Sequence, residues 1–160
     1  MIRKATFEDL DQIMPLFDKA RLFMRSHGNM NQWINGYPSE SVIRTDIEKG
    51  NFYVEEYDGR LTGCFSFIIG DDPTYSFIEG EWIDSKKYGT VHRLASDGTH
   101  PGFSDRCFDF CFSLIDNVRA DTHADNIKMQ ESLIRNGFIY CGIIYLEDGS
   151  PRKAYQQLRR

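Results

Sequence analysis

The stretch YGTVHRLASDGTHPGFS, residues 88–104, carries the strongest local signal in the chain. Apolar and β-branched residues up to Ser96 predict a strand, residues 97–102 predict a loop, and Ser104 is placed to cap a following helix. A strand that runs through a glycine-containing loop into a helix offers unpaired backbone N–H groups and the positive end of a helix dipole. The stretch therefore predicts a phosphate- or pyrophosphate-binding loop, with an ordinary turn-rich connection as the alternative.

A second unit of strand and helix follows this loop. Residues 118–123 predict a strand that ends in polar residues, and the helix predicted over 126–136 stops at Gly137. Two further strands are predicted over 138–146 and 152–158, joined by a turn. The second half of the chain therefore alternates strands with helices.

The first half has a different order. A short strand over 2–5 precedes a helix that Thr6 caps and Gly28 ends, and Pro15 predicts a kink or break within that helix. The other predicted elements are a turn-rich segment over 29–38, a helix capped by Ser39 or Ser41 and ended by Gly50, strands over 51–57 and 60–69 joined by an Asp58-Gly59 turn, and an irregular strand over 76–83. Together they predict a mixed α/β fold with a partly antiparallel sheet.

Length and composition limit the class of protein. The 160 residues, 41% hydrophobic and 27% charged, predict a single domain over 1–160. The net charge of −5 argues against a surface for nucleic acid or anionic membranes. No apolar run reaches the roughly 20 residues of a membrane span, and the N-terminus lacks the apolar core of a secretion signal. We therefore expect a cytoplasmic protein with neither nucleic acid nor membrane as partner.

The four cysteines, Cys64, Cys107, Cys111 and Cys141, lie in apolar segments. Cys107 and Cys111 share one face of a predicted helix, but no second pair of ligands has the spacing of a zinc site. We therefore expect four reduced, buried thiols and no metal.

Three motifs of the chain recur together in one protein family. The loop THPGFS over 99–104 keeps, at Gly102, the glycine of the pattern (Gln/Arg)-x-x-Gly-x-(Gly/Ala). Asn126 opens a helix that closes 11 positions later with Gly137-Phe138, and the segment QWINGYP over 32–38 follows the first helix. On these motifs, and on the order of elements along nearly the whole chain, the protein resembles the GCN5-related N-acetyltransferase (GNAT) family, and a bacterial branch of it in particular.

The resemblance implies a fold and a cosubstrate. The implied fold is a central, mostly antiparallel sheet with a V-shaped splay between two strands, flanked by about four helices. The implied reaction transfers the acetyl group of acetyl-CoA to a small-molecule or amino-acid-like amine, which attacks directly in a ternary complex without a metal. A backbone N–H of the splayed strand would polarise the thioester carbonyl. The implied cofactor-binding residues are Leu94, Ala95, Gly102, Phe103, Ser104, Asp105, Arg106 and Asn126.

The residues that transfer protons are not assigned by these motifs. In many GNAT relatives a tyrosine four residues before the glycine of Gly-Phe protonates the departing thiolate, but that position is Leu133 here. Unassisted release is one alternative, and the other donors are a water or the side chains of Tyr140, Tyr145 and Ser132. The base that deprotonates the amine needs hydrogen-bond reach and a pKa near the working pH. Its candidates, each with a structural or solvated role as the alternative, are Glu79, Glu81, His92 and His123.

Aromatic side chains in irregular segments are candidates for the acceptor site. Trp33 and Tyr37 lie in the turn-rich 29–38 segment, so we expect them to line a pocket, whereas Trp82 fits a pocket or simple packing equally well. Alternation along the 88–96 strand predicts two faces, with Thr90, His92 and Leu94 on one and Val91, Arg93 and Ala95 on the other.

Two other functions remain open at this point. A non-catalytic CoA-binding or regulatory module would keep the fold and lose turnover. Two features favour it: Leu133 replaces the family's tyrosine, and only Gly102 of the loop over 99–104 matches the family pattern. The other alternative is a transferase that acts on a protein N-terminus or lysine. A homodimer is expected only by analogy with the family.

Overall fold

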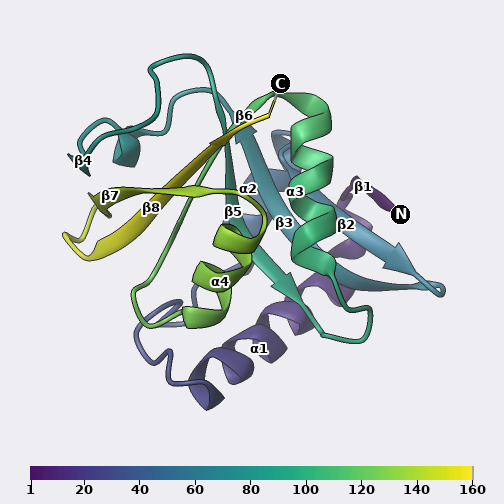
Figure 1. Cartoon of the computed structure of the whole chain (residues 1–160). Coiled ribbons are helices and arrows are strands. Elements are labelled where there is room, and N and C mark those ends of the chain that lie inside the picture. The colour runs from purple at the N-terminus through teal and green to yellow at the C-terminus, as the bar shows by residue number, and fades with distance from the viewer. Residues whose placement is uncertain (160) are drawn as a thin grey trace.

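The computed structural model describes residues 1–159, which form one eight-stranded sheet in the order β1-β2-β3-β5-β6-β8-β7-β4 (Figure 1). All neighbouring strands are antiparallel except β5 and β6, which are parallel. The strands are β1 (Ile2–Lys4), β2 (Phe52–Tyr57), β3 (Arg60–Ile69), β4 (Glu79–Gly80), β5 (Gly89–Ser96), β6 (Asn117–Thr122), β7 (Ile139–Tyr145) and β8 (Pro151–Leu158). The predicted mixed fold with a mostly antiparallel sheet is confirmed.

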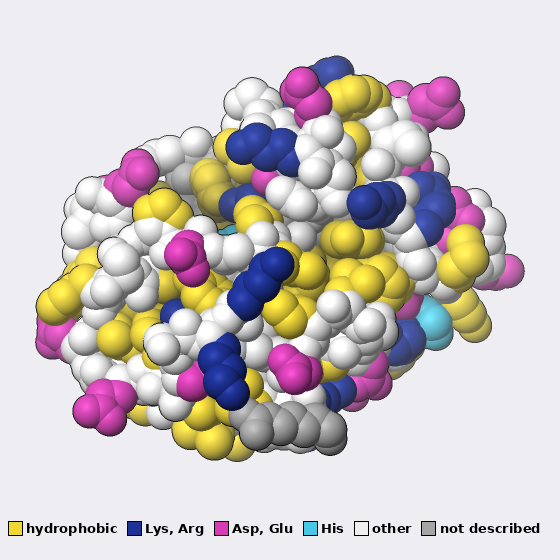
Figure 2. Space-filling model, turned by 90° about the horizontal axis from the view of Figure 1, so that it is seen from above, with side chains coloured by type: hydrophobic (Ala, Val, Ile, Leu, Met, Phe, Trp, Pro, Cys, Tyr) yellow, Lys and Arg dark blue, Asp and Glu magenta, His cyan; other side chains and the backbone are white. Residues whose placement is uncertain are grey.

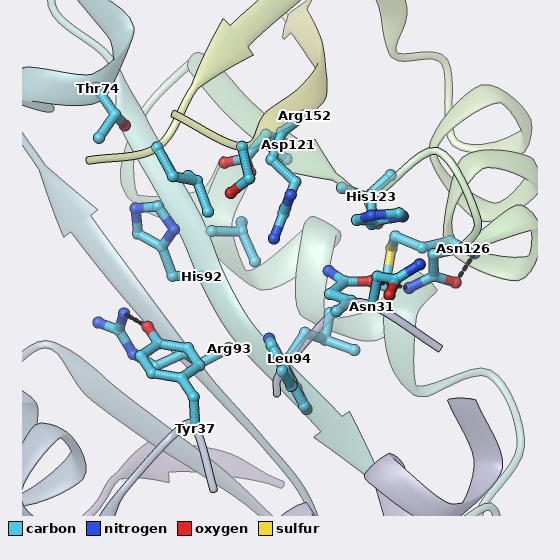
Figure 3. A pocket seen from close by; sticks show the side chains of 18 of the residues that line it. Asn31, Tyr37, Thr74, His92, Arg93, Leu94, Asp121, His123, Asn126 and Arg152 are labelled. Atoms are coloured by element: carbon cyan, nitrogen blue, oxygen red, sulfur yellow. Dashed lines mark hydrogen bonds between the residues drawn. The ribbon is translucent and has the colours of Figure 1, made fainter. Parts of the chain in front are cut away.

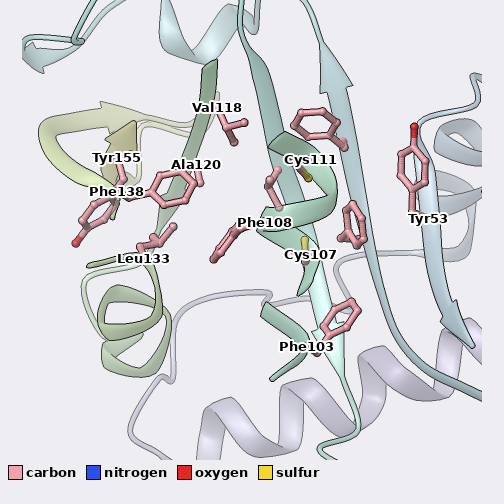
Figure 4. Close-up of a cluster of buried hydrophobic side chains, with 13 residues drawn as sticks. Tyr53, Phe103, Cys107, Phe108, Cys111, Val118, Ala120, Leu133, Phe138 and Tyr155 are labelled. Atoms are coloured by element: carbon pink, nitrogen blue, oxygen red, sulfur yellow. The ribbon is translucent and has the colours of Figure 1, made fainter. Parts of the chain in front are cut away.

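Helices cover both faces of the sheet. The described part of the chain contains the 3₁₀ turns η1 (Phe7–Asp9) and η2 (Pro73–Tyr75) and the helices α1 (Leu10–Ser26), α2 (Glu40–Glu48), α3 (Phe103–Leu114) and α4 (Ile127–Arg135). Helices α1 and α2 pack on one face through a core that includes Phe17, Ile43 and Phe52. Helix α3 packs on the other face, where Cys107 and Phe108 belong to the same buried cluster as Leu133 of α4 and Phe108 points toward Leu133 (Figure 4).

The first helix differs from its prediction in the residue at which it begins and in its continuity at Pro15. Thr6 caps the 3₁₀ turn η1, and its backbone N–H donates to the Asp9 carboxylate at 2.7 Å before α1 starts. The break considered at Pro15 is absent, because α1 runs without interruption from Leu10 to Ser26. Its apolar residues lie on the side that packs against β3 and β5, so burial of that face supports the helix through the proline.

The ends of the other helices follow local capping chemistry. The Ser39 hydroxyl accepts from the Val42 N–H, so Ser39 rather than Ser41 caps α2. Helix α3 begins two residues earlier than predicted, because Gly102 with φ +89° serves as its N-cap in place of Ser104. The Ser104 hydroxyl is bonded to that of Ser132 instead.

Strand β5 contains a bulge that the alternation rule does not predict. In its pairing with β3, Ser66 faces His92 and Cys64 faces Ala95, so two residues, Arg93 and Leu94, lie opposite one. Arg93 has φ +53°, and the extra residue reverses the order of faces beyond it. Leu94 therefore packs on the core that contains Val91, and not on the face of His92, as alternation predicted.

Strands β5 and β6 separate after a short parallel ladder. Only residues 89–91 of β5 pair with residues 118–120 of β6, although both strands continue. The β6-facing edge of β5 beyond Val91 is therefore free of a neighbouring strand, which is the splay that the resemblance implied.

The segment before β5 has less regular structure than predicted. The irregular strand expected over 76–83 is reduced to β4, because the Ile83 N–H donates to the Gln156 side chain at 2.8 Å and not to a strand partner. Trp82 donates to the Tyr75 carbonyl at 3.1 Å and stacks on Arg119, so it packs and does not line the main cavity.

Burial divides the cysteines into two groups. Cys64, Cys107 and Cys111 are fully buried, and burial raises the pKa of the Cys64 and Cys107 thiols. The prediction was wrong for Cys141, which lies in the outer strand β7 and is only partly buried.

Two surface properties are visible on the described residues. Acidic and basic side chains are interspersed on the face shown in Figure 2, with hydrophobic side chains between them. Among residues 1–159, no helix has the length and apolar character needed to cross a membrane.

Candidate functional site

A cavity of about 880 Å³ lies where β5 and β6 separate (Figure 3). Its wall comes mainly from residues 31–37, the loop that contains Asp72 and Thr74, residues 91–94 of β5, residues 120–123 at the end of β6, the start of α4, and the β7–β8 turn with Arg152. The predicted site residues that line it are Trp33, Tyr37, His92, Leu94, His123 and Asn126.

The other candidates for proton transfer lie outside this wall. Glu81 and Tyr140 are exposed, and Tyr140 packs edge-on against Tyr155. Glu79 accepts a hydrogen bond from the Tyr145 hydroxyl, and Ser132 is bonded to Ser104. Leu133, which occupies the position of the family's tyrosine, is fully buried at the cavity wall and has no proton to donate.

His92 is held by a carboxylate. Its Nε2 lies 2.8 Å from Asp72 Oδ2, so Nε2 donates to the carboxylate, and in the neutral ring the lone pair lies on Nδ1. Within the described chain Nδ1 has no hydrogen-bond partner. Burial raises the pKa of Asp72, but hydrogen bonds from His92 and Thr74 outweigh burial and lower that pKa from 3.8 to about 2. Asp72 is therefore ionised at neutral pH and fixes the ring so that Nδ1 can accept a proton.

The low pKa of Asp72 predicts a pH-dependent contribution to stability. A carboxyl whose pKa is lower in the folded state stabilises the protein above its unfolded pKa of 3.8, and this contribution disappears as the pH falls to about 2. Urea unfolding of the wild type and Asp72→Asn should therefore show a difference in free energy that is largest near neutral pH and shrinks below pH 3.8. Asp71→Asn, an exposed neighbour, is the control. A difference that does not change with pH would contradict this assignment.

His123 is oriented in the opposite way. Its Nδ1 accepts the Asp125 backbone N–H at 3.0 Å, so the neutral ring carries its proton on Nε2. Burial and the nearby Arg152 charge lower the pKa of His123. The side chain at the cavity wall is therefore a neutral hydrogen-bond donor, whereas a base needs a free lone pair.

Arg93 at the β5 bulge connects α2 with the 29–38 segment at the cavity wall. Its guanidinium lies 2.7 Å from Asp46 of α2, and its Nη1 donates to the Tyr37 hydroxyl at 2.9 Å. Trp33 lines the cavity and packs edge-on against Phe17 with ring centroids 5.5 Å apart. Both predicted aromatic residues therefore lie at the cavity, with Trp33 also joined to the core.

Asn126 has two contacts within the protein. Its Oδ1 accepts the Met129 N–H at 3.1 Å and caps α4, and its Nδ2 donates to Gln32 Oε1 at 3.0 Å. Arg25 donates to the carbonyls of Asn29, Gln32 and Trp33, which anchors the same segment to α1. Asn126 thus joins the start of α4 to the 29–38 segment across the cavity, and its role toward a cofactor stays a prediction.

The predicted pyrophosphate loop lies at the N-terminus of α3, apart from the residues that line the cavity. No acceptor in the part of the chain described by the structure takes the N–H groups of Phe103, Ser104 and Asp105. Arg106 turns away from them, because its guanidinium binds the buried Glu55 at 2.6 Å and the carbonyls of His100 and Pro101. Arg106 therefore holds the loop in place, and its predicted charge interaction with a phosphate is untested.

Three residues of the cavity wall were not predicted from the sequence as site residues. Asp72 and Asp121 were absent from the candidates, and Arg152 lies just after the β7–β8 turn. Asp121 begins the polar stretch 121–126 from which only His123 and Asn126 were selected, and no motif contains Asp72 or Arg152. The Gly-containing turn at 147–150 marked only the position at which the chain reverses.

Comparison with known proteins identifies the family. No family model and no curated protein matches the sequence. The chain is similar to the crystal structure of an acetyltransferase of the GNAT family from Streptococcus agalactiae, with 33% identity, 100% of this chain and 95% of that chain covered, and a TM-score of 0.91.

Two more distant structures share the fold. A GNAT-family acetyltransferase from Listeria monocytogenes is 21% identical with a TM-score of 0.74, over 99% of this chain and 94% of that one. A GNAT-like decarboxylase in complex with isobutyryl-CoA is 13% identical with a TM-score of 0.68, over 100% of both chains. The chain belongs to the GNAT family, whose fold supports acyl-CoA-dependent acyltransferase activity.

Proposed function

We propose that the protein transfers the acetyl group of acetyl-CoA to the primary amine of a small acceptor. The observation that carries this proposal is the His92–Asp72 pair, which lies in the cavity at the separation of β5 and β6 and leaves Nδ1 of the imidazole free. A base held in one tautomer beside an open strand edge is the arrangement that amine deprotonation requires.

Two features of the chain fit acetyl-CoA. The free edge of β5 beyond Val91 can pair with the amide groups of an extended pantetheine arm. The N–H groups of Phe103, Ser104 and Asp105 lie at the positive end of α3, where an anion such as pyrophosphate is favoured. Gly102 has φ +89°, a conformation that favours glycine, and a Cβ there would lie 3.0 Å from Arg106 Nη1.

Each residue has a separate role in the proposed reaction. Acetyl-CoA supplies the acetyl thioester when it is bound. His92 Nδ1 takes a proton from the acceptor ammonium, and Asp72 stabilises the imidazolium that results. A backbone N–H at the β5 edge donates to the carbonyl oxygen as charge develops there. The amine nitrogen forms a bond to the carbonyl carbon, the carbon–sulfur bond breaks, and the surplus proton of the nitrogen passes through water to the departing thiolate, so no side-chain acid is needed. Leu133 is a buried apolar residue at this wall and takes no part in proton transfer.

The first test of this proposal is ligand-induced stabilisation. Acetyl-CoA and free CoA should both raise the melting temperature, whereas ATP should not, because a ligand that binds only the native state stabilises it by about 2.7 kcal/mol at about 100 times Kd. Release of CoA thiol in the presence of a panel of amines then tests turnover. Binding without amine-dependent thiol release would instead identify a non-catalytic CoA-binding module, and no stabilisation would overturn the proposal.

A further inference from the structure

Arg152 of β8 is a buried cation without an ion-pair partner. Only 9% of the residue is exposed, and it lines the cavity. The one hydrogen bond of its guanidinium goes from Nη1 to the Pro151 carbonyl at 2.8 Å. No carboxylate among residues 1–159 lies within 4.0 Å of it. Because a guanidinium has five N–H donors, most of its binding capacity is unused.

The other cationic side chains of the cavity are already neutralised. Arg93 is paired with the buried Asp46, and His92 is paired with Asp72. His123 is fixed as a neutral donor by the Asp125 N–H. Among the described residues of this wall, Arg152 is therefore the one cationic side chain that has no counter-charge in contact with it.

Burial makes this state costly without a ligand. Desolvation lowers the pKa of Arg152, and the carboxylates of Asp121 and Asp148 offset this only from a distance. The Asp121 carboxylate is hydrogen-bonded to another side chain, since its Oδ1 accepts from the Tyr75 hydroxyl at 2.6 Å. Figure 3 shows the Arg152 side chain directed into the cavity between Asp121 and His123. A buried, unpaired guanidinium directed into a cavity is suited to a planar anion that forms two parallel hydrogen bonds.

We propose that the amine acceptor carries a carboxylate and that Arg152 binds it. This inference rests on the proposed acetyl transfer and names the class of acceptor, an amino acid or a related amino carboxylate. A monoanion fits better than a dianionic phosphate, because the same wall contains Asp121, Glu147 and Asp148 and only one unpaired cation. The acceptor would lie with its carboxylate at β8 and its amine toward His92.

The test compares amino carboxylates with their uncharged counterparts. Glycine, β-alanine, 4-aminobutyrate and a panel of amino acids, each paired with its carboxamide, are assayed for thiol release with acetyl-CoA. For the preferred acceptor, kcat/KM should be about 10- to 100-fold higher for the carboxylate than for its carboxamide, which is the range for a hydrogen-bonded charged pair. This comparison uses the wild-type protein and does not depend on a variant that folds.

Substitution of Arg152 should remove this preference. Arg152→Met should lower kcat/KM for the carboxylate to the level of the carboxamide, mainly through KM, and leave KM for acetyl-CoA unchanged. Arg152→Lys should restore part of the loss, because it returns the charge without the second hydrogen bond. Arg44→Met, an exposed arginine of α2 paired with Glu40, is the matched control and should keep the preference.

The possible failures are distinguishable. Equal use of carboxylates and carboxamides by the wild type, an equal loss on both in Arg152→Met, or a preference for 2-aminoethyl phosphate would overturn the inference while acetyl transfer stands. If no amine is acetylated, the proposed function fails. Calorimetric titration with the same amino carboxylates then still decides whether Arg152 binds the anion. Binding that is lost in Arg152→Met supports anion recognition, and no binding in the wild type contradicts it.

Discussion

Replacement of His92 by glutamine should lower kcat by about 100- to 10,000-fold, the usual contribution of a positioned general base. Glutamine keeps the approximate size of the side chain and can still donate to Asp72, but it offers no imidazole lone pair to the acceptor ammonium. KM for acetyl-CoA should stay within about threefold of the wild type, because the proposed donor contacts are backbone groups of β5 and α3. Steady-state kinetics by thiol release measures both quantities.

His123→Gln is the matched control for this substitution. Its Nδ1 already accepts the Asp125 N–H, so His123 has no lone pair toward the cavity, and its replacement should cost far less than that of His92. Steady-state kinetics by thiol release compares kcat of the two variants with that of the wild type. The reverse order of effects would assign the base to His123 and contradict the proposed role of the His92–Asp72 pair.

Gly102→Glu should weaken acetyl-CoA binding by about 100-fold or more, since hydrogen bonds to a charged group contribute about 1.5–3 kcal/mol each and at least two would be lost. The new side chain begins 3.0 Å from Arg106 Nη1 and brings a carboxylate to the N–H groups at the start of α3. That carboxylate would compete with and repel pyrophosphate at the same place. Isothermal titration with acetyl-CoA measures the loss.

Backbone strain needs its own control, because Gly102 has φ +89° and any side chain is strained there. Gly59→Glu introduces the same residue at φ +78° in the β2–β3 turn, where no atom lies within 4 Å of the new Cβ. This variant should suffer similar strain and keep its affinity for acetyl-CoA. Unaltered affinity in Gly102→Glu would show that the pyrophosphate does not lie at the start of α3.

Features that depend on neighbouring residues were predictable from the sequence. The capping position of Thr6, the Asp58-Gly59 turn and the helix that runs from Asn126 to Gly137 follow from side chains that meet backbone groups a few residues away. Even here a tertiary contact prevailed at Ser104, where a hydroxyl suited to capping is bonded to Ser132 instead. The presence of an element was therefore easier to predict than its first residue.

The site was predictable only in part, from residue types and the segments in which they lie. His92, His123, Trp33 and Tyr37 were named from residue type and segment, and the cavity contains all four. Asp72 was missed although it holds His92, because 20 residues and a loop separate the two in sequence. Arg152 was missed because an arginine that follows a turn is usually solvated, and only the folded sheet buries this one.

The sequence by itself determined the family, the order of strands and helices, and the residue types available for acetyl transfer. The tertiary structure alone decided the orientation of those residues. The bulge at Arg93 reverses the faces of β5, Asp72 selects one tautomer of His92, and burial leaves Arg152 charged and unpaired at the cavity wall. The physical reason is range: capping and periodicity act within a few residues, whereas register, hydrogen-bond partners and desolvation depend on segments that only the folded sheet brings together.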